Sequence, residues 1–499
     1  MLFNSYIFIC ILLPVALLGW YGLNYFGLNR AASIFLTGIS LWFYGYFNVF
    51  YLLIIICSIA FNYVVSLIAD RAREEGLGRL LMVIAVFVNL GILFYFKYFD
   101  FFLQNLNAVT GAGVPLKGIL LPLGISFFTF QQLSYVIDRC LGRVEHAGLI
   151  EYAQFVTFFP QLIAGPIVLH DELIPQFRDL SLRRFDIEFF ARGVRLFVLG
   201  LAKKMLLADV LAGPVNYAFA ISHDLDSLTI VFVMLMYAFE LYFDFSGYCD
   251  MAMGIGLMFN IVLPMNFDSP YQSSTVKELW NRWHMTLSRF FITYVYVPLG
   301  GSRRGYARTL LNILIVFTLS GLWHGANWTY VLWGLINGLF VIWDNLCIVG
   351  VEGTDYKREC RVYIPRRVGQ VLTFCSFLLT LVFFRSSSVP EAFRLIGTAF
   401  SFKWNGRLTD VLSHLSSPEF YVVEEAARMA SEKLVPWVHV VMSALMIALS
   451  FVLVMGPSVT VRAVRETERP VRRAILLGVL FVWCFTSLSQ VSTFLYFNF

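Results

Sequence analysis

Apolar residues in this chain come in long blocks separated by short polar stretches that carry most of the arginines and lysines. A helix needs about 20 apolar residues to cross a bilayer. The blocks long enough to approach this length lie near residues 6–23, 31–48, 49–69, 81–103, 118–137, 196–222, 229–258, 307–325, 326–349, 368–386, 437–456 and 474–495. The pattern therefore predicts an all-α polytopic membrane protein with roughly twelve crossings.

The basic stretches predict which loops face the cytoplasm, because cytoplasmic loops carry an excess of Lys and Arg. They are residues 70–79, 138–146, 183–195, 301–304, 357–367 and 462–473. An alternating path through these loops places the N-terminus outside. No Lys or Arg precedes the first apolar block, so we interpret that block as a retained span rather than a signal peptide.

Three segments do not fit a simple alternation of spans and loops. Residues 151–169 are apolar but contain two prolines and a glycine between basic flanks, which is typical of a re-entrant segment shielded by protein. Residues 259–305 are too polar for lipid and too aromatic for a solvated loop, so we expect them to line a cavity. Residues 387–436 are predicted to form an external loop with one short amphipathic helix around Glu424–Lys433.

Composition agrees with a membrane protein and excludes several other classes. Of the 499 residues, 59% are hydrophobic and only 14% are charged, whereas soluble domains carry about 25% charged residues. The net charge of +5 is modest, and the basic residues form no concentrated face, so a nucleic-acid partner is not expected. The eight cysteines are scattered without a Cys-x-x-Cys pair, so neither a disulfide framework nor a metal site is predicted.

Acidic residues interrupt the apolar block near 229–258. Glu240, Asp244 and Ser246 lie inside this block, and Glu240 and Asp244 are one helical turn apart on a shared face. Ionisable groups inside a bilayer cost several kcal/mol and need an explanation. These residues form either a polar network that packs helices together or the polar wall of a substrate cavity.

A second cluster, Trp280 to Arg289, combines indole, imidazole and guanidinium groups. On a helix, Trp280, Trp283 and His284 have the spacing i, i+3 and i+4 and share one face. Arg282 and Arg289 point elsewhere and could meet phosphates or lipid headgroups. The alternatives are an interfacial amphipathic helix with an aromatic belt and a cavity wall that holds a substrate.

The third cluster surrounds His324, which ends a long uncharged run. Gly321 and Gly325 flank it with a spacing that lets another helix or a ligand approach the backbone closely. A buried imidazole tends to be neutral and can accept a proton, so His324 is a candidate general base for acyl transfer. The neighbouring Trp323 and Asn327 are candidate donors for the oxyanion of a tetrahedral intermediate. The alternative is a structural histidine that is bonded to a backbone carbonyl.

Signatures of soluble catalysts are missing from the sequence: there is no Gly-x-Ser-x-Gly elbow, no Walker A loop and no His-Glu-x-x-His pair. A transporter remains an alternative because acids lie within the spans. Transporters usually contain paired inverted repeats, however, and none is apparent here.

Several long motifs, in order along the chain, resemble those of the bacterial membrane-bound O-acyltransferases. They are Leu-Pro-Leu-Gly-Ile-Ser-Phe-Phe-Thr-Phe-Gln (121–131), Phe-Phe-Pro-Gln-Leu-Ile-Ala-Gly-Pro-Ile (158–167), Leu-Tyr-Phe-Asp-Phe-Ser-Gly-Tyr-Cys-Asp-Met-Ala (241–252), Asn-Phe-Asp-Ser-Pro-Tyr (266–271), Trp-Asn-Arg-Trp-His-Met-Thr-Leu-Ser (280–288), Leu-Gly-Gly-Ser-Arg (299–303), Gly-Leu-Trp-His-Gly-Ala-Asn-Trp-Thr-Tyr (321–330) and Phe-Leu-Tyr-Phe-Asn-Phe (494–499). The resemblance is strongest to the membrane subunit that O-acetylates alginate and to related exopolysaccharide and peptidoglycan O-acetyltransferases. It departs from the alginate subunit at 289–293, which leaves the polymer open.

The resemblance implies one membrane domain over residues 1–499, with a catalytic core near 118–349 and peripheral spans at 1–117 and 368–499. It implies a ring of 11–12 helices with re-entrant segments around a thin centre. His324 is implied as the catalytic histidine and His284 as the second histidine on the same path. Trp323, Asn327, Trp283, Trp280, Asp244, Ser246, Arg282 and Glu240 are the residues expected to line the cavity.

The implied reaction moves an acetyl group from a cytoplasmic thioester, with acetyl-CoA as the expected donor, to an acceptor outside the bacterial inner membrane. No permanently bound cofactor and no metal are expected. The expected partners are membrane lipid and a periplasmic or membrane-anchored protein that accepts or transfers acetyl groups. An alginate- or cellulose-like polysaccharide is the first acceptor, and peptidoglycan, teichoic acid, protein or lipid are the alternatives.

Overall fold

The computed structural model describes residues 1–354, 359–415, 417–458, 460, 471–490 and 495, whose regular secondary structure is helical apart from one small sheet. The sheet pairs β1 (Val349–Val351) in parallel with β2 (Val362–Ile364). The chain forms two compact units. The first contains Met1–Leu199 and Tyr248–Met265, and the second contains Gly200–Gly247 and the described residues from Asn266 onward.

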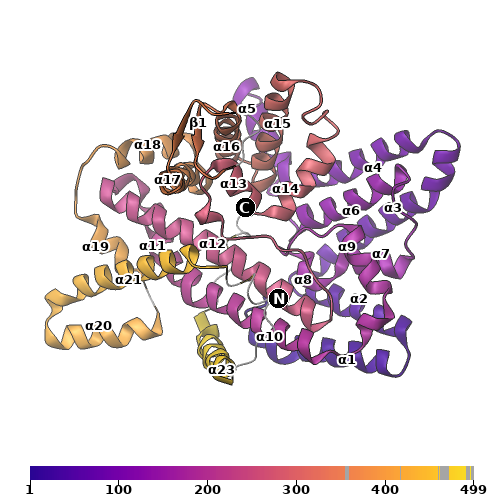
Figure 1. Cartoon of the computed structure of the whole chain (residues 1–499), viewed down its shortest axis with the longest axis horizontal. Coiled ribbons are helices and arrows are strands. Elements are labelled where there is room, and N and C mark those ends of the chain that lie inside the picture. Colours follow the sequence, from indigo (N-terminus) through magenta and orange to yellow (C-terminus); the bar gives the residue numbers. More distant parts are fainter. Residues whose placement is uncertain (355–358, 416, 459, 461–470, 491–494, 496–499) are drawn as a thin grey trace. The chain divides into compact units, whose positions relative to one another are not determined.

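The helices follow one another as Figure 1 labels them. The first unit contains η1 (Phe8–Leu12), α1 (Leu13–Tyr25), α2 (Asn29–Gly45), α3 (Val49–Glu74), α4 (Gly78–Leu93), η2 (Phe94–Tyr98), α5 (Phe99–Thr110), α6 (Ile125–Cys140), α7 (Leu149–Thr157), α8 (Phe159–Leu162), α9 (His170–Arg178) and η3 (Leu180–Arg183). Two helices, α10 (Ile187–Ala202) and α12 (Ser227–Met258), contribute residues to both units. The second unit contains η4 (Lys203–Ala208), α11 (Asp209–Ala220), η5 (Ser222–Asp224), η6 (Pro270–Gln272), α13 (Val276–Arg282), α14 (Met285–Phe291), η7 (Ile292–Tyr296), α15 (Tyr306–His324), α16 (Trp328–Leu346), α17 (Arg366–Arg385), α18 (Val389–Ala399), α19 (Arg407–Leu412), α20 (Pro418–Ala430), η8 (Glu432–Leu434), α21 (Val435–Met455), α23 (Val471–Thr486) and η9 (Ser487–Gln490).

The described part of each apolar block is mainly helical, which confirms the predicted all-α polytopic class. Among the described residues, seven helical stretches are long and apolar enough to span a membrane. They are Phe8–Tyr25, Val49–Glu74, Gly78–Thr110, Ser227–Met258, Tyr306–His324, Arg366–Arg385 and Glu432–Met455. The other blocks form shorter or more polar helices, and the count of roughly twelve crossings stays a prediction.

Amide side chains join the helices of the first unit, where α3, α4 and α6 lie side by side (Figure 1). Asn62 on α3 and Asn89 on α4 exchange hydrogen bonds of 3.0 and 2.8 Å. Gln132 on α6 accepts from Asn62 at 3.0 Å and from Tyr152 on α7 at 3.1 Å, and it donates to Ser58 at 2.9 Å. These polar groups are buried and satisfy one another, which offsets the cost of placing them in an apolar environment.

The segment 151–169 is interrupted as its prolines and glycine predict. Helix α7 ends at Thr157 because Phe158 leaves the helical region with ψ of 106°. The short helix α8 follows, and residues 163–169 continue without regular structure. The side chains from Phe158 to His170 are all buried, so this irregular backbone is shielded by protein. Its depth in the membrane stays a prediction.

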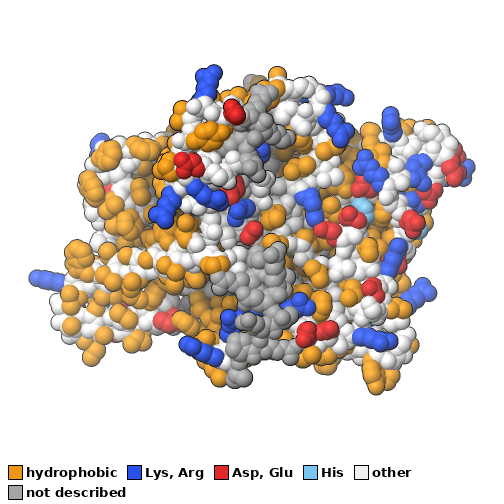
Figure 2. All heavy atoms as spheres, in the orientation of Figure 1, with side chains coloured by type: hydrophobic (Ala, Val, Ile, Leu, Met, Phe, Trp, Pro, Cys, Tyr) orange, Lys and Arg blue, Asp and Glu red, His pale blue; other side chains and the backbone are white. Residues whose placement is uncertain are grey.

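In the second unit, the outward faces of the long helices are apolar. Figure 2 shows hydrophobic side chains spread over α20 and α21. Trp437, Val441 and Leu445 on α21 are exposed. They belong to a helix whose mean hydropathy is well above the value needed for a membrane span. Exposed apolar side chains on such a helix fit contact with lipid tails.

Residues 387–436 contain more helix than the sequence suggested. Among the described residues of this range, the structure has the three α-helices α18, α19 and α20, followed by the short η8 and the start of α21. The expected helix around Glu424–Lys433 corresponds to α20, but α20 begins at Pro418, where Ser417 caps its N-terminus, and ends at Ala430. The prediction missed α18 and α19 because both are short and lack a long apolar run, whereas Ser388 and Gly406 before them are ordinary helix-start signals.

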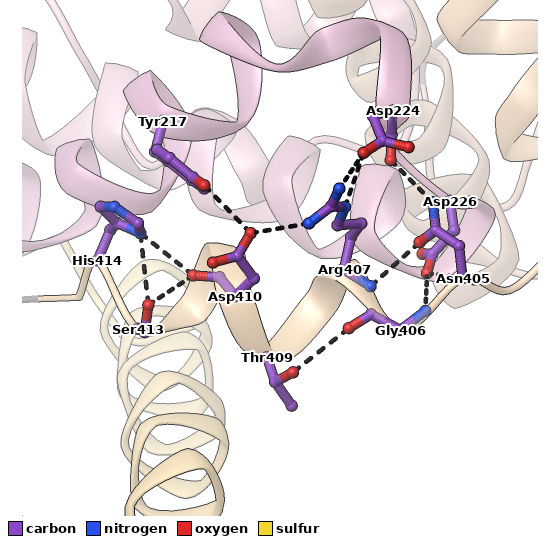
Figure 3. A network of polar contacts seen from close by, with 10 residues as sticks. All are labelled: Tyr217, Asp224, Asp226, Asn405, Gly406, Arg407, Thr409, Asp410, Ser413 and His414. Carbon is purple, nitrogen blue, oxygen red and sulfur yellow. Dashed lines mark hydrogen bonds and ion pairs between the residues drawn. The ribbon is translucent and has the colours of Figure 1, made fainter.

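A polar network fastens this segment to α11 and α12 (Figure 3). Asp226 accepts hydrogen bonds from the backbone N–H groups of Thr229 at 2.8 Å, Asn405 at 3.1 Å and Gly406 at 3.2 Å. Arg407 pairs with Asp224 at the surface. Although burial raises the pKa of Asp226, the hydrogen bonds from these three residues outweigh it and hold that pKa below its usual value.

We expect Asp226→Ala to destabilise the protein by on the order of 3 kcal/mol, because three N–H groups around a buried carboxylate lose their acceptor. The lowered pKa means that this contribution is present above the pKa of the unfolded chain and is lost as the pH falls through the folded pKa, below about pH 4. Thermal unfolding of the detergent-solubilised protein at pH 7 measures the effect. Arg407→Ala, which removes an exposed ion pair, is the control and should destabilise the protein much less, because solvent screens this pair. Equal losses in the two variants would contradict this assignment.

Candidate functional site

The two histidines singled out from the sequence meet in the second unit. His324 is the last residue of α15 and His284 lies between α13 and α14. Their ring centroids are 6.3 Å apart, and the residues are only 5% and 2% exposed. Two buried imidazoles from segments 40 residues apart in sequence therefore share one site.

Close packing between α15 and α16 determines where His324 lies. A Cβ on Gly321 would lie 2.2 Å from the carbonyl oxygen of Tyr330, and one on Gly334 would lie 2.3 Å from that of Phe317. Only glycine fits at these two positions, which confirms the predicted close approach. After His324 the chain turns through extended Gly325, and α16 begins three residues later.

The backbone at His284 is unusual and corrects one prediction. Trp280, Trp283 and His284 do not share one helix face, because α13 ends at Arg282 and His284 adopts the left-handed conformation with φ of 47°. This conformation is rare for residues with a side chain, and it occurs often at functional sites. The sequence showed no proline or glycine at the break, so it could not reveal it.

Asn266 fixes the imidazole of His284. The Nδ1 atom of His284 lies 3.1 Å from the side-chain oxygen of Asn266, which also accepts from the hydroxyl of Thr286 at 2.9 Å. The N–H of Met285 donates to the backbone oxygen of Asn266 at 3.0 Å. An amide oxygen can only accept, so His284 carries its proton on Nδ1 and its lone pair on Nε2. Asn266 belongs to a motif of the sequence, but its contact with His284 could not be predicted from spacing.

Aromatic rings surround His324. The ring centroids of Trp323, Trp333 and Phe384 lie 5.0, 5.1 and 5.4 Å from that of His324. A small cavity of about 10 Å³ adjoins them, and its lining residues are Leu241, Phe245, Trp283, His324, Trp333, Phe377, Leu381 and Phe384. His324 is the one titratable side chain in this lining. The sequence analysis missed Trp333 and Phe384 because neither residue lies in a motif that indicates a catalytic role.

Trp280 and Trp333 lead from this small cavity toward a larger one. Their ring centroids are 5.4 Å apart, and Trp280 contacts Phe317 at 5.6 Å. Phe317 lines a cavity of about 920 Å³ whose walls include α13, α15 and the end of α16. The larger cavity carries the cationic side chains of Lys277 and Arg366 and the acidic side chains of Glu278 and Asp344. The indole nitrogens of Trp280 and Trp333 are buried and have no hydrogen-bond partner among the described residues.

The acidic cluster on α12 has a partner that the sequence did not suggest. Lys204 on η4 lies 2.6 Å from Asp244 and 2.7 Å from Asp209; Lys204 and Asp244 are buried, and Asp209 is partly exposed. Asp244 also accepts from the backbone N–H of Leu495 at 2.9 Å. Glu240 shares the face of Asp244 as predicted, and one oxygen of its buried carboxyl has no hydrogen-bond partner among the described residues. None of these four side chains lines the small cavity.

The remaining predicted residues have structural contacts of their own. Ser246 is buried on α12, beside the cavity residue Phe245. Asn327 caps α16, where its oxygen accepts from the N–H of Thr329, and its amide nitrogen donates to the carbonyl of Ser387 at 3.0 Å. Arg282 pairs with Glu278 at 3.0 Å.

Among the residues that the structure describes, no three His, Cys, Asp or Glu side chains gather in a manner that would hold a metal ion. The groups that the site does offer are two neighbouring imidazoles, indole N–H donors and an apolar cavity. These groups suit proton transfer and stabilisation of an oxyanion.

Comparisons with known proteins point to the same chemistry. The model of the membrane-bound O-acyltransferase family matches residues 142–387. A peptidoglycan O-acetyltransferase of Helicobacter pylori is 36% identical over 534 aligned positions, which cover 100% of this chain and 98% of the relative. A probable alginate O-acetylase of Pseudomonas aeruginosa is 37% identical over 413 positions, or 81% of this chain and 75% of that protein. A teichoic acid D-alanyltransferase of Streptococcus thermophilus is 29% identical over 284 positions, or 52% of this chain and 68% of that protein.

The glycine contact provides a test of the site's architecture. We expect Gly321→Ala to destabilise the protein by about 1–3 kcal/mol, because the new methyl group must push α15 away from α16. Gly338→Ala is the matched control, because a Cβ there would lie 3.1 Å from a side-chain atom of Phe317 and can be accommodated by a small shift. Thermal unfolding of both variants measures the difference. A Gly321→Ala protein as stable as Gly338→Ala would contradict the close packing.

Proposed function

The chain belongs to the membrane-bound O-acyltransferase family, and from this premise we propose that it moves an acetyl group from a cytoplasmic thioester to a glycan outside the inner membrane. The observation that carries the proposal is the buried His324, which faces a small apolar cavity and adjoins a second, larger cavity through tryptophan rings.

The larger cavity is the proposed site of the donor, acetyl-CoA. Its lining holds charges of both signs, and of these Lys277 and Arg366 suit the phosphates of a coenzyme A thioester, with Arg366 also 3.7 Å from Glu278. Ser302 and Arg366, which line the cavity, come from basic loops that the positive-inside rule assigns to the cytoplasm. The wall formed by α15 runs from Tyr306 to Phe317, about 16 Å at 1.5 Å per residue. This path leads the thioester end of the donor toward Trp280 and the histidines.

His324 is the proposed general base. It takes the proton of the acceptor hydroxyl while the hydroxyl oxygen attacks the thioester carbonyl carbon. The indole N–H of Trp333, buried beside His324, donates to the oxyanion of the tetrahedral intermediate. When the carbon–sulfur bond breaks, the thiolate of coenzyme A takes the proton from His324. His284 lies on the same path, and Asn266 holds its Nε2 lone pair in one orientation to accept a hydrogen bond from a substrate.

The size of the cavity at His324 favours a short acyl group. Its volume of about 10 Å³ leaves room for about one water-sized group, far below the ~300–1,000 Å³ of typical ligand pockets. Bulky rings and leucines form its wall, so an acetyl group fits it better than a long fatty acyl chain. This supports acetyl transfer over the alternative of a fatty-acyl transfer to protein or lipid.

Peptidoglycan is the first acceptor we propose, because the similarity to a peptidoglycan O-acetyltransferase extends over the whole of both chains. The second candidate is an exported alginate-like polysaccharide, supported by similarity over 81% of this chain to a probable alginate O-acetylase. In both cases we propose that a periplasmic or membrane-anchored protein passes the acetyl group to the glycan.

We expect His324→Ala to lower transfer from acetyl-CoA by at least about 10²-fold, because the proton acceptor is lost. Trp333→Phe keeps an aromatic ring but removes the N–H donor, and should lower kcat by about 10²-fold. The measurement is release of coenzyme A and acetylation of acceptor by purified protein in vesicles, with the donor added to the cytoplasmic face only. Trp343→Phe, at an exposed position on the same helix, is the control. Normal transfer by the His324→Ala protein would contradict the assignment of the base.

The acceptor is tested by mass spectrometry of O-acetyl groups in peptidoglycan and in extracellular polysaccharide. We compare the wild type, a deletion strain and a strain that produces His324→Ala at equal membrane abundance. Loss of acetyl groups from peptidoglycan in both mutants is the expected result, because both lack the transfer step. Loss confined to the polysaccharide would select the second candidate. Unchanged acetyl content in both polymers would overturn the proposed acceptor class.

A further inference from the structure

Two cysteines lie opposite each other at the end of α16. The parallel strands pair Val349 with Val362 and Gly350 with Tyr363. Continued backward by two residues, this register places Cys347 opposite Cys360. The N–H of Arg361 donates to the carbonyl of Cys347 at 3.3 Å, which is the hydrogen bond that a parallel ladder predicts at this position.

The side chains of the pair are neighbours. The Cys347 thiol is close enough to Cys360 to raise its pKa. The Sγ of Cys360 packs on Gly350 so closely that a Cβ there would lie 2.8 Å from it. Disulfides join residues whose Cα atoms are about 4.4–6.8 Å apart, and neighbouring strands are separated by about 4.8 Å. A disulfide between the two cysteines therefore needs no large backbone movement.

The pair lies at the wall of the larger cavity. Cys347 is one of its lining residues. It also caps the C-terminus of α16, in the left-handed conformation with φ of 52°. In the same turn, Asp344 accepts from the N–H of Lys277 at 2.8 Å, and the carbonyl of Asn345 accepts from the hydroxyl of Tyr306 at 2.7 Å. Hydrogen bonds from the turn at Cys347 therefore hold the N-terminal ends of α13 and α15, which form the wall of the cavity. We expect a displacement of Cys347 to move both helix ends.

The surroundings favour a disulfide over a metal ion. A structural zinc site needs four ligands, and no group of three His, Cys, Asp or Glu side chains is found in the described part of the chain. The nearby loop 357–367 is predicted to be cytoplasmic, where thiols are kept reduced and disulfides are usually transient or redox-sensing.

We propose that Cys347 and Cys360 are a redox-active thiol pair, which a peroxide converts to a disulfide that hinders entry of the donor to the larger cavity. One sulfur attacks the peroxide, the O–O bond breaks, and a sulfenic acid and water form. The second thiol then displaces water from the sulfenic acid and gives the disulfide. In total, two thiols and one hydrogen peroxide yield one disulfide and two waters, and a dithiol reductant reverses the reaction.

The protonation state of the pair governs its rate. Burial, together with the neighbouring Cys347 thiol, raises the pKa of Cys360. A raised pKa leaves less of the reactive thiolate at pH 7, so oxidation is slow at neutral pH and becomes faster as the pH rises toward 9.

The first test is the disulfide itself. Full-length protein in vesicles is treated with hydrogen peroxide, its remaining thiols are alkylated, and the peptides are analysed by mass spectrometry without reduction. We expect a linked peptide that joins Cys347 to Cys360, forms faster at pH 9 than at pH 7 and disappears with dithiothreitol. Cys375→Ser, which changes an exposed cysteine on α17, should still form the link. Absence of the link in the wild type would overturn the proposal.

The second test concerns the donor and rests on the proposed function. After peroxide treatment, we expect the KM for acetyl-CoA to rise several-fold in the wild type and in Cys375→Ser, but not in Cys360→Ser. An unchanged KM in a fully linked wild type would overturn the effect on donor entry. If the reduced wild type transfers no acetyl group at all, the proposed function fails, while the linked peptide still decides whether the thiol pair exists.

Discussion

The packing of α15 against α16 is the constraint on which the site depends. Backbone meets backbone at Gly321 and Gly334, so the two helices approach each other more closely than any larger side chain would allow. This approach places Trp333 of α16 against His324 at the end of α15. Close packing of small residues is a main source of helix association in membranes, where lipid tails compete with apolar side chains. The position of the His324 ring and the stability of the α15–α16 pair therefore have the same cause.

Polar groups near the site are held by partners from other elements. Asn266 orients His284, and Lys204 lies between two carboxylates, Asp209 and Asp244. Each arrangement offsets the cost of removing a polar group from water, and removing one partner would leave the other buried without compensation. The acids of α12 are explained in part as a helix-packing network, one of the two interpretations that the sequence left open. Glu240, with one carboxyl oxygen lacking a partner among the described residues, is not explained by that network.

The sequence predicted the elements well and the contacts between them less well. Blocks of about 20 apolar residues specify helices directly, and the glycines around His324 predicted the close approach of another helix. The break at His284 could not be predicted, because its left-handed backbone depends on hydrogen bonds to Asn266, 18 residues away. The pairing of Lys204 with Asp244 could not be predicted, because Lys204 lies in a different apolar block and Asp244 follows it by 40 residues. Residue types indicated which groups needed partners, but only tertiary packing identified them.

A transfer across a membrane requires that two substrates meet while the membrane stays closed to water and ions. Under the proposed function, the second unit meets this requirement with two cavities of unequal size and a layer of rings between them. The larger cavity has polar walls with charges of both signs, whereas the cavity at His324 is small and lined with apolar side chains. Trp280 and Trp333 lie between the two, and tryptophan suits this position because its ring excludes water while its N–H can bind an oxyanion. In the proposed mechanism, the tryptophan rings that separate the two cavities therefore also supply the N–H donor for the transfer between them.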